Sequence, residues 1–191
     1  KMGIGTSSPG DLLEVQAVAG SPGVINIATG ELTVVDSNVL GRIDFYAPLE
    51  SSGTDAILPG ASIWAEADDT FTTTVNNTEI VFATATSATA AEVMRLDATG
   101  KLGINTAIPS TLLEVQADAG SAGTATLSSA ELTVVDGDVL GRINFQAPLE
   151  SDGTDAIAIA AAIYAEADDT FSASVNNTEI VFATGESEAA T

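Results

Sequence analysis

Hydrophobic and polar residues alternate along several short segments of this chain, which is typical of β-strands with one packed face. Within residues 42–47, Ile43, Phe45 and Ala47 alternate with polar residues and with Tyr46. Residues 63–67 alternate in the same way. Each of these segments is therefore predicted to be a strand that turns its hydrophobic positions to one side of a sheet.

Two further segments, 32–35 and 79–84, are rich in β-branched and aromatic residues and are also predicted to be strands. Stretches rich in Gly, Ser, Pro and Asn separate the predicted strands and are typical of turns. The Ala-rich segment 156–163 has helix propensity, but Pro59 lies in the corresponding segment of the first half. We therefore expect a strand there too, and an all-β fold overall.

The chain contains itself twice, displaced by 100 residues. When residues 1–91 are set over 101–191, about 58 of the 91 positions match, which marks an internal repeat. We predict two fibre-like modules, 1–91 and 103–191, joined by a connecting strand and turn at 92–102. Segment 92–100 has no second copy here, so we expect the chain to be a window of a longer protein.

The two copies differ in an informative way. The second copy keeps the inward positions as Ile143 and Phe145 and changes the outward ones, so the inward face is predicted to be packed. Segment 24–30 differs most from 124–130 and is predicted to be exposed. The residues expected to form the packed faces are Ile43, Phe45, Ile63, Phe71, Ile80, Phe82 and their counterparts Ile143, Phe145, Ile163, Phe171, Ile180 and Phe182.

The composition limits what one chain can bury. Hydrophobic residues make up 45% of the 191 residues, but most are small, and there are only six Phe, two Tyr and one Trp. A module of this size with so few large side chains has a marginal core. We expect an obligate oligomer that packs against copies of itself.

Charge excludes several classes of partner and chemistry. The net charge of −22 leaves no basic footprint for nucleic acid and disfavours anionic membranes. The chain has no Cys and no His, which removes disulfides, thiolate chemistry and the commonest general base. No segment is apolar for long enough to span a membrane, and no signal-peptide pattern is visible.

Residues 94–109, Met-Arg-Leu-Asp-Ala-Thr-Gly-Lys-Leu-Gly-Ile-Asn-Thr-Ala-Ile-Pro, carry a family resemblance. They resemble a stretch found in bacteriophage tail fibres and other virion appendages, where Gly-Ile-Gly-Thr-x-x-Pro is followed by a Leu-Glu-Val strand. Residues 3–9 repeat the end of this motif. Residues 40–84 are similar to modules of predicted marine phage structural proteins. Asn105 stands where the family prefers Gly, and Asn tolerates a positive φ well.

This resemblance implies a homotrimeric, β-rich, rod-like shaft in an extracellular virion, built of tandem β-sandwich or β-prism modules. It also implies contacts with other virion proteins, and with a host receptor through regions outside this chain. Two other classes stay open: a bacterial extracellular adhesin or filament subunit, and a polysaccharide-degrading tailspike. A head fibre is a variant within the virion class.

Clustered acids are candidates for calcium ligands, because hard cations take carboxylate oxygens. The pairs recur at the same place in both copies, and a solvated loop is the simpler interpretation. The candidates are Asp68, Asp69, Asp168, Asp169, Asp136 and Asp138, with Asp152 and Asp155 as further ones. No other cofactor is expected.

A glycosidase pair at the same acids is disfavoured, because catalytic carboxylates need a shaped cleft, so we expect no enzyme. Trp64 and its counterpart Tyr164 are interpreted as intersubunit contacts rather than as a platform for sugar. Arg42 and Arg142 lie near carboxylates and are predicted to form structural ion pairs.

Overall fold

The computed structural model describes residues 1–151 and 156–185 and is all-β. The chain divides into two compact units, residues 1–124 and residues 125–191. The first unit contains β1 (Met2–Ile4), β2 (Leu13–Val15), β3 (Val39–Phe45), η1 (Asp55–Ile57), β4 (Ala61–Ala67), β5 (Thr78–Thr84), β6 (Ala91–Leu96), β7 (Leu102–Ile104) and β8 (Leu113–Val115). The second contains β9 (Val139–Gln146), β10 (Ile159–Ala167) and β11 (Thr178–Thr184).

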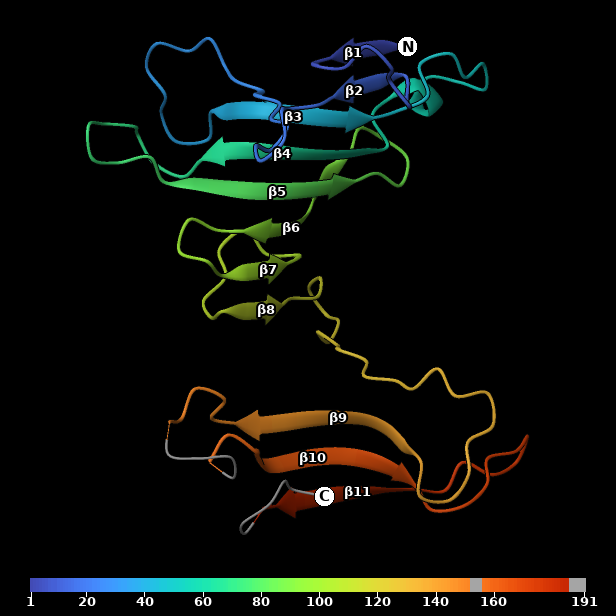
Figure 1. The fold of residues 1–191 in the computed structure, drawn as a ribbon. Helices are drawn as coiled ribbons and strands as arrows, with labels where there is room; N and C mark the ends of the chain where they lie inside the picture. The colour runs from blue at the N-terminus through green and yellow to red at the C-terminus, as the bar shows by residue number, and fades with distance from the viewer. Residues whose placement is uncertain (152–155, 186–191) are drawn as a thin grey trace. The chain divides into compact units, whose positions relative to one another are not determined.

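A six-stranded sheet forms most of the first unit, in the order β3-β4-β5-β6-β7-β8 (Figure 1). Its neighbours are antiparallel except for β7 and β8, which are parallel. A separate parallel pair, β1 and β2, repeats the β7–β8 pairing. The only helical element in the described residues is η1, a single 3₁₀ turn, and no helix there is long and apolar enough to cross a membrane.

The second unit repeats the first half of that sheet as β9, β10 and β11. Ile43 pairs with Ile63, which pairs with Phe82, and their counterparts pair identically in the second unit. This register confirms the strands predicted at 42–47, 63–67 and 79–84. β10 also confirms that the Ala-rich segment 156–163 enters a strand, although Ala-rich sequences favour helices.

The strand predicted at residues 32–35 is wrong. These residues pair with no strand, and Leu32 is fully exposed. Instead, the Val35 amide donates to Asn38 Oδ1 at 2.9 Å, and the Val34 carbonyl accepts from the Phe71 amide at 3.0 Å. Backbone groups bonded to a turn and to a neighbouring loop are not available for a ladder of strand hydrogen bonds.

The Gly-Ile-Gly-Thr motif ends the first of the two parallel strands and begins the connection to the second. Gly5 has φ +80°, and a Cβ there would meet the Gln16 carbonyl oxygen at 2.0 Å. Asn105 has φ +57° at the matching position, which confirms that this site needs a left-handed residue. Asn is the residue after Gly that best tolerates this conformation.

The compact units do not follow the sequence repeat. β6 lies in the predicted connecting region, and β7 and β8 lie almost entirely in the predicted second module. All three continue the sheet of β3, β4 and β5 and so belong to the first unit. The contacts divide the chain at 124/125. The modules 1–91 and 103–191 describe the repeat period and stay a prediction.

The hydrophobic residues that are buried are mostly small. They are Ala67, Val81 and Ala83 in the first unit and Ala162, Tyr164, Ala167 and Ala183 in the second. Such a set excludes little apolar area from water, so burial within one chain stabilises each unit only weakly.

Candidate functional site

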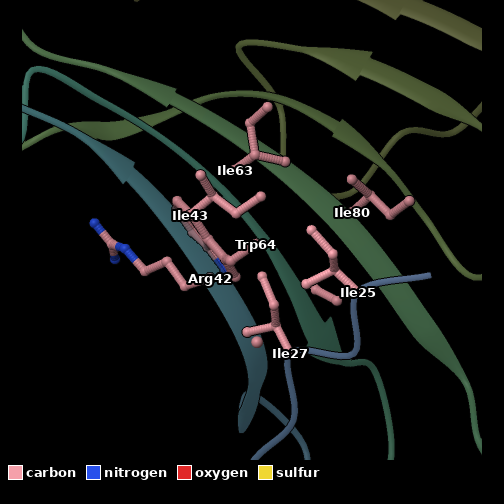
Figure 2. A pocket seen from close by; sticks show the side chains of 9 residues that line it. Ile25, Ile27, Arg42, Ile43, Ile63, Trp64 and Ile80 are labelled. Atoms are coloured by element: carbon pink, nitrogen blue, oxygen red, sulfur yellow. The ribbon is translucent and has the colours of Figure 1, made fainter. Parts of the chain in front are cut away.

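An apolar hollow of about 280 Å³ lies on one face of the first sheet (Figure 2). Ile43 of β3, Ile63 of β4 and Ile80 of β5 form its floor, because residues at paired positions of neighbouring strands point to the same side. Ile25 and Ile27 come from the irregular segment 24–30 and border it. The sheet and this segment together therefore make a concave hydrophobic surface.

The close approach of segment 24–30 depends on a glycine in β3. A Cβ on Gly41 would lie 2.5 Å from the Ile27 carbonyl oxygen. In the second unit, a Cβ on Gly141 would lie 2.4 Å from the Leu127 carbonyl oxygen. Both glycines therefore permit the same backbone contact, which a larger residue would prevent.

The second unit has its own hollow, of about 230 Å³, at the corresponding place. Its floor again has three isoleucines, Ile143, Ile163 and Ile180. Ala125 and Leu127 replace the two isoleucines of the bordering segment. The floor is identical in the two units, while the rim changes.

We call the sheet face that carries the hollow in each unit the apolar face. In the first unit it contains Ile43, Phe45, Ile63, Ile80 and Phe82, and in the second unit it contains their counterparts. The prediction that these residues are packed is wrong within one chain. Among the most exposed are Phe45 (54%), Phe145 (51%), Ile180 (61%) and Phe182 (75%). Ile63, Phe71, Phe82, Ile163 and Phe171 are half-buried. Alternation identifies which residues share a face, but it does not identify what covers that face.

The opposite face of the first sheet, here called the polar face, carries the charged and hydrogen-bonded side chains together with the buried Val81 and Ala83. Arg42 forms an ion pair of 2.5 Å with Asp44, and both side chains bond the buried Ser62 hydroxyl. The Ser62 hydroxyl and the Arg42 guanidinium lower the pKa of Asp44. The predicted ion pair is thus confirmed for Arg42, whereas Arg142 donates to Asn144 in the second unit.

Trp64 lies on this polar face, and Tyr164 lies on the corresponding face of the second sheet. The Trp64 indole donates to Glu66 Oε2 at 2.8 Å, and the Arg42 guanidinium lies 5.1 Å from its ring centroid. Arg142 covers Tyr164 at 4.9 Å, and Tyr164 is only 8% exposed. An arginine therefore covers one face of each ring. Their predicted intersubunit role stays a prediction.

Arg95 of β6 is the centre of an ion cluster that the sequence analysis missed. It forms ion pairs with Glu92 at 2.5 Å, with Glu66 at 4.0 Å, and with Glu79. Glu79 is 4% exposed, and its burial raises its pKa, while the hydrogen bond from Arg95 opposes that shift. The hydrogen bond to Glu92 raises the pKa of Arg95. Finding this cluster from sequence would have required the β5–β6 register.

The acidic calcium candidates stay in turns. The carboxylates of Asp69, Asp169 and Asp138 each accept a hydrogen bond from a nearby main-chain amide at 2.7 Å. Asp68, Asp136 and Asp168 are exposed, while Asp152 and Asp155 lie outside the described residues. Among the described residues, no three acidic side chains converge as a metal site would require. Calcium binding stays an untested prediction.

Comparison with known proteins gives limited similarity. No family model and no curated protein matches the chain. Among solved structures, the carboxy-terminal domain of the bacteriophage T5 L-shaped tail fibre is 14% identical, with a TM-score of 0.44, over 91% of this chain and 82% of that one. The same domain with its intra-molecular chaperone domain is 15% identical, with a TM-score of 0.42, over 91% of this chain and 56% of that one. Similarity this low carries no weight in assigning a function.

Proposed function

We propose that this chain is a shaft segment of a virion fibre, most simply a phage tail fibre, that assembles as a homotrimer and has no enzymatic role. The apolar face is the observation that supports this proposal. It occurs in both units with the same isoleucine floor, and it is exposed in the single chain. An exposed hydrophobic surface of this kind marks an interaction site.

The size of the surface supports assembly. The chain exposes 13544 Å². A compact monomer of its mass exposes ~8,400 Å², and two separate globules of the sizes of the units expose ~10,000 Å² together. The excess of ~3,500–5,000 Å² per chain is comparable with the area that obligate oligomers bury.

The distribution of charge also supports copies of the chain as the occupants of this face. None of the floor residues is charged, whereas Arg42, Asp44, Glu66, Glu79 and Arg95 all lie on the polar face or in the ion cluster. With a net charge of −22, chains repel each other everywhere except where uncharged surfaces meet. Association through the apolar face keeps the acids in water.

The repeat and its motif support a shaft in particular. Both copies of the Gly-Ile-x-Thr motif fold as the same parallel strand pair, with the same hydrogen bonds at each end. A unit that recurs at a fixed period lengthens a rod without new contacts having to be designed. The proposed role of the rod is to hold a distal adhesin away from the particle during host attachment.

Light scattering tests the proposal. We expect a mass three times the 19.2 kDa of the chain. Replacing Phe45 and Phe145 by Ala removes two half-exposed rings from the apolar face, so the double variant should lose the trimer while its circular dichroism stays that of β-structure. The matched control replaces Leu32 and Leu132, which are exposed outside the sheets, by Ala and should stay trimeric.

A monomeric wild-type chain would refute the proposed trimer. So would a Phe45→Ala/Phe145→Ala variant that keeps the wild-type mass and the full melting temperature.

A further inference from the structure

One strand sequence occurs twice in this chain in two different settings. β5 and β11 both read Thr-Glu-Ile-Val-Phe-Ala-Thr. β5 lies between β4 and β6, whereas β11 pairs with β10 on one side, and no strand of the described residues pairs with its other edge (Figure 1). The surroundings of β5 therefore show which kind of strand is missing beside β11.

β6 pairs with the backbone of β5 and also provides an ion-pair partner for one of its side chains. It pairs antiparallel with β5, with Arg95 opposite Val81 and Met94 opposite Phe82. From that position Arg95 reaches Glu79 on β5 and Glu66 on β4. Val81 is then fully buried, and Glu79 is 4% exposed.

The described residues of the second unit include the two glutamates but no counterpart of Arg95. Glu166 and Glu179 stand where Glu66 and Glu79 stand in the first unit, and neither has an ion pair within the described residues. Glu179 is exposed rather than buried. The neighbouring Phe182 is 75% exposed, whereas Phe82 is half-buried.

We propose that the outer edge of β11, together with Glu166 and Glu179, is a docking site for a strand of the β6 type, Ala-Glu-Val-Met-Arg-Leu, supplied by a further copy of the repeat. This inference rests on the proposed fibre, in which modules follow one another. The added strand pairs with β11 in the β5–β6 register, so its arginine lies opposite Val181 and bonds Glu179. Main-chain pairing provides affinity and the arginine provides specificity.

The open edge of β1 is a second place where a strand of the β6 type fits. β7 pairs with β6 on the side away from β8, and β1 is the counterpart of β7. No strand of the described residues pairs with β1 on that side. A β6-type strand placed between β11 of one module and a β1-type strand of the next would reproduce the β5-β6-β7 arrangement. It would also cover two edges that otherwise invite aggregation.

Extending the full chain tests the proposal. The sequence of residues 92–104 is appended after Thr191, and amide hydrogen exchange is followed along β11. We expect exchange at Ile180 and Phe182 to slow by at least about tenfold, since a charge-assisted hydrogen bond adds to the new backbone bonds. The matched control has methionine in place of the arginine of the appended segment, and a second variant carries Glu179→Gln. Both should lose most of the added protection.

Unchanged exchange in β11 of the extended chain would overturn the docking site, as would equal protection by the segment that lacks the arginine. Protection that appears in the unextended chain and grows with concentration would assign the edge to pairing between copies, and would also overturn it. The mass of the extended chain, measured by light scattering on the same sample, reports the proposed trimer separately. Failure of one proposal is therefore distinguishable from failure of the other.

Discussion

Replacing Arg95 by Met removes the charge at the centre of the ion cluster but keeps most of the aliphatic stem. Glu79, which is 4% exposed, then has no cation against it. Leaving one member of a buried pair uncompensated costs about 3–5 kcal/mol. Arg95 and Glu92 keep 12% and 25% of their side-chain surface exposed, so water reaches the cluster. We therefore expect the lower end, a loss of about 3 kcal/mol in the free energy of unfolding at pH 7.

The loss should depend on pH in a defined direction. Burial already raises the pKa of Glu79, and removing Arg95 removes the group that opposes the shift. A carboxyl whose pKa is higher in the folded state than in the unfolded state favours folding at low pH, and that contribution is lost as the pH rises through the folded pKa. The variant should therefore recover part of its deficit as the pH is lowered from 7. Adding Glu79→Gln should recover part of it at pH 7.

Trp64 provides the assay, because it is the single tryptophan of the chain and its indole bonds Glu66 of the same cluster. Urea unfolding followed by its fluorescence reports the first unit alone, at fixed protein concentration. The matched control is Arg42→Met, which breaks a pair whose side chains are 33% and 36% exposed and should therefore cost less than Arg95→Met. An Arg95→Met loss no larger than the control's, or one that grows as the pH falls, would refute this reasoning.

Three other expectations concern the turns. Ser37 has φ +66° where Gly137 stands in the second copy, so Ser37→Gly should raise the free energy of unfolding by about 1 kcal/mol and Gly137→Ser should lower it, both measured by urea denaturation. The Lys101 amide and the Thr99 hydroxyl and amide lower the pKa of Asp97. The ionised Asp97 therefore stabilises the fold above its ordinary pKa of 3.8, and this stabilisation is lost as the pH falls through its folded pKa. The difference in free energy of unfolding between wild type and Asp97→Asn should shrink in acid, and a constant difference would contradict this. Treatment with a calcium chelator should leave the mass from light scattering unchanged, because the described carboxylates do not converge; a fall in mass would make the acidic turns metal sites.

The sequence predicts strands better than it predicts their surroundings. The alternation at 42–47 and at 63–67 placed Ile43 and Ile63 on one face, and these two residues do pair. Pro59 correctly argued against a helix through this segment, because strand β4 begins two residues after it, at Ala61. Comparison of the two copies also separates the constant face of these strands from the variable one.

What the sequence did not predict depends on contacts between distant segments. Leu32 lies in a hydrophobic run, but its neighbours bond to a turn, and β-propensity alone does not reveal this competition. The Arg95 cluster follows from the pairing of β5 with β6, and the sequence does not specify that register. The exposure of Phe45 follows from the number of chains present, which alternation within one chain does not encode.

The identity of β5 and β11 also has a consequence for folding. Because the two strands read the same over all seven residues, local side-chain preference gives β6 no reason to choose between them. Chain connectivity makes the choice: residues 85–90 close the loop to β5, whereas residues 97–177 separate β6 from β11. The difference in loop-closure entropy favours β5 by only about 2 kcal/mol. Refolding should therefore pass through a slowly corrected population in which β6 has paired with the wrong copy of the strand, and that population should grow with each repeat added to the chain.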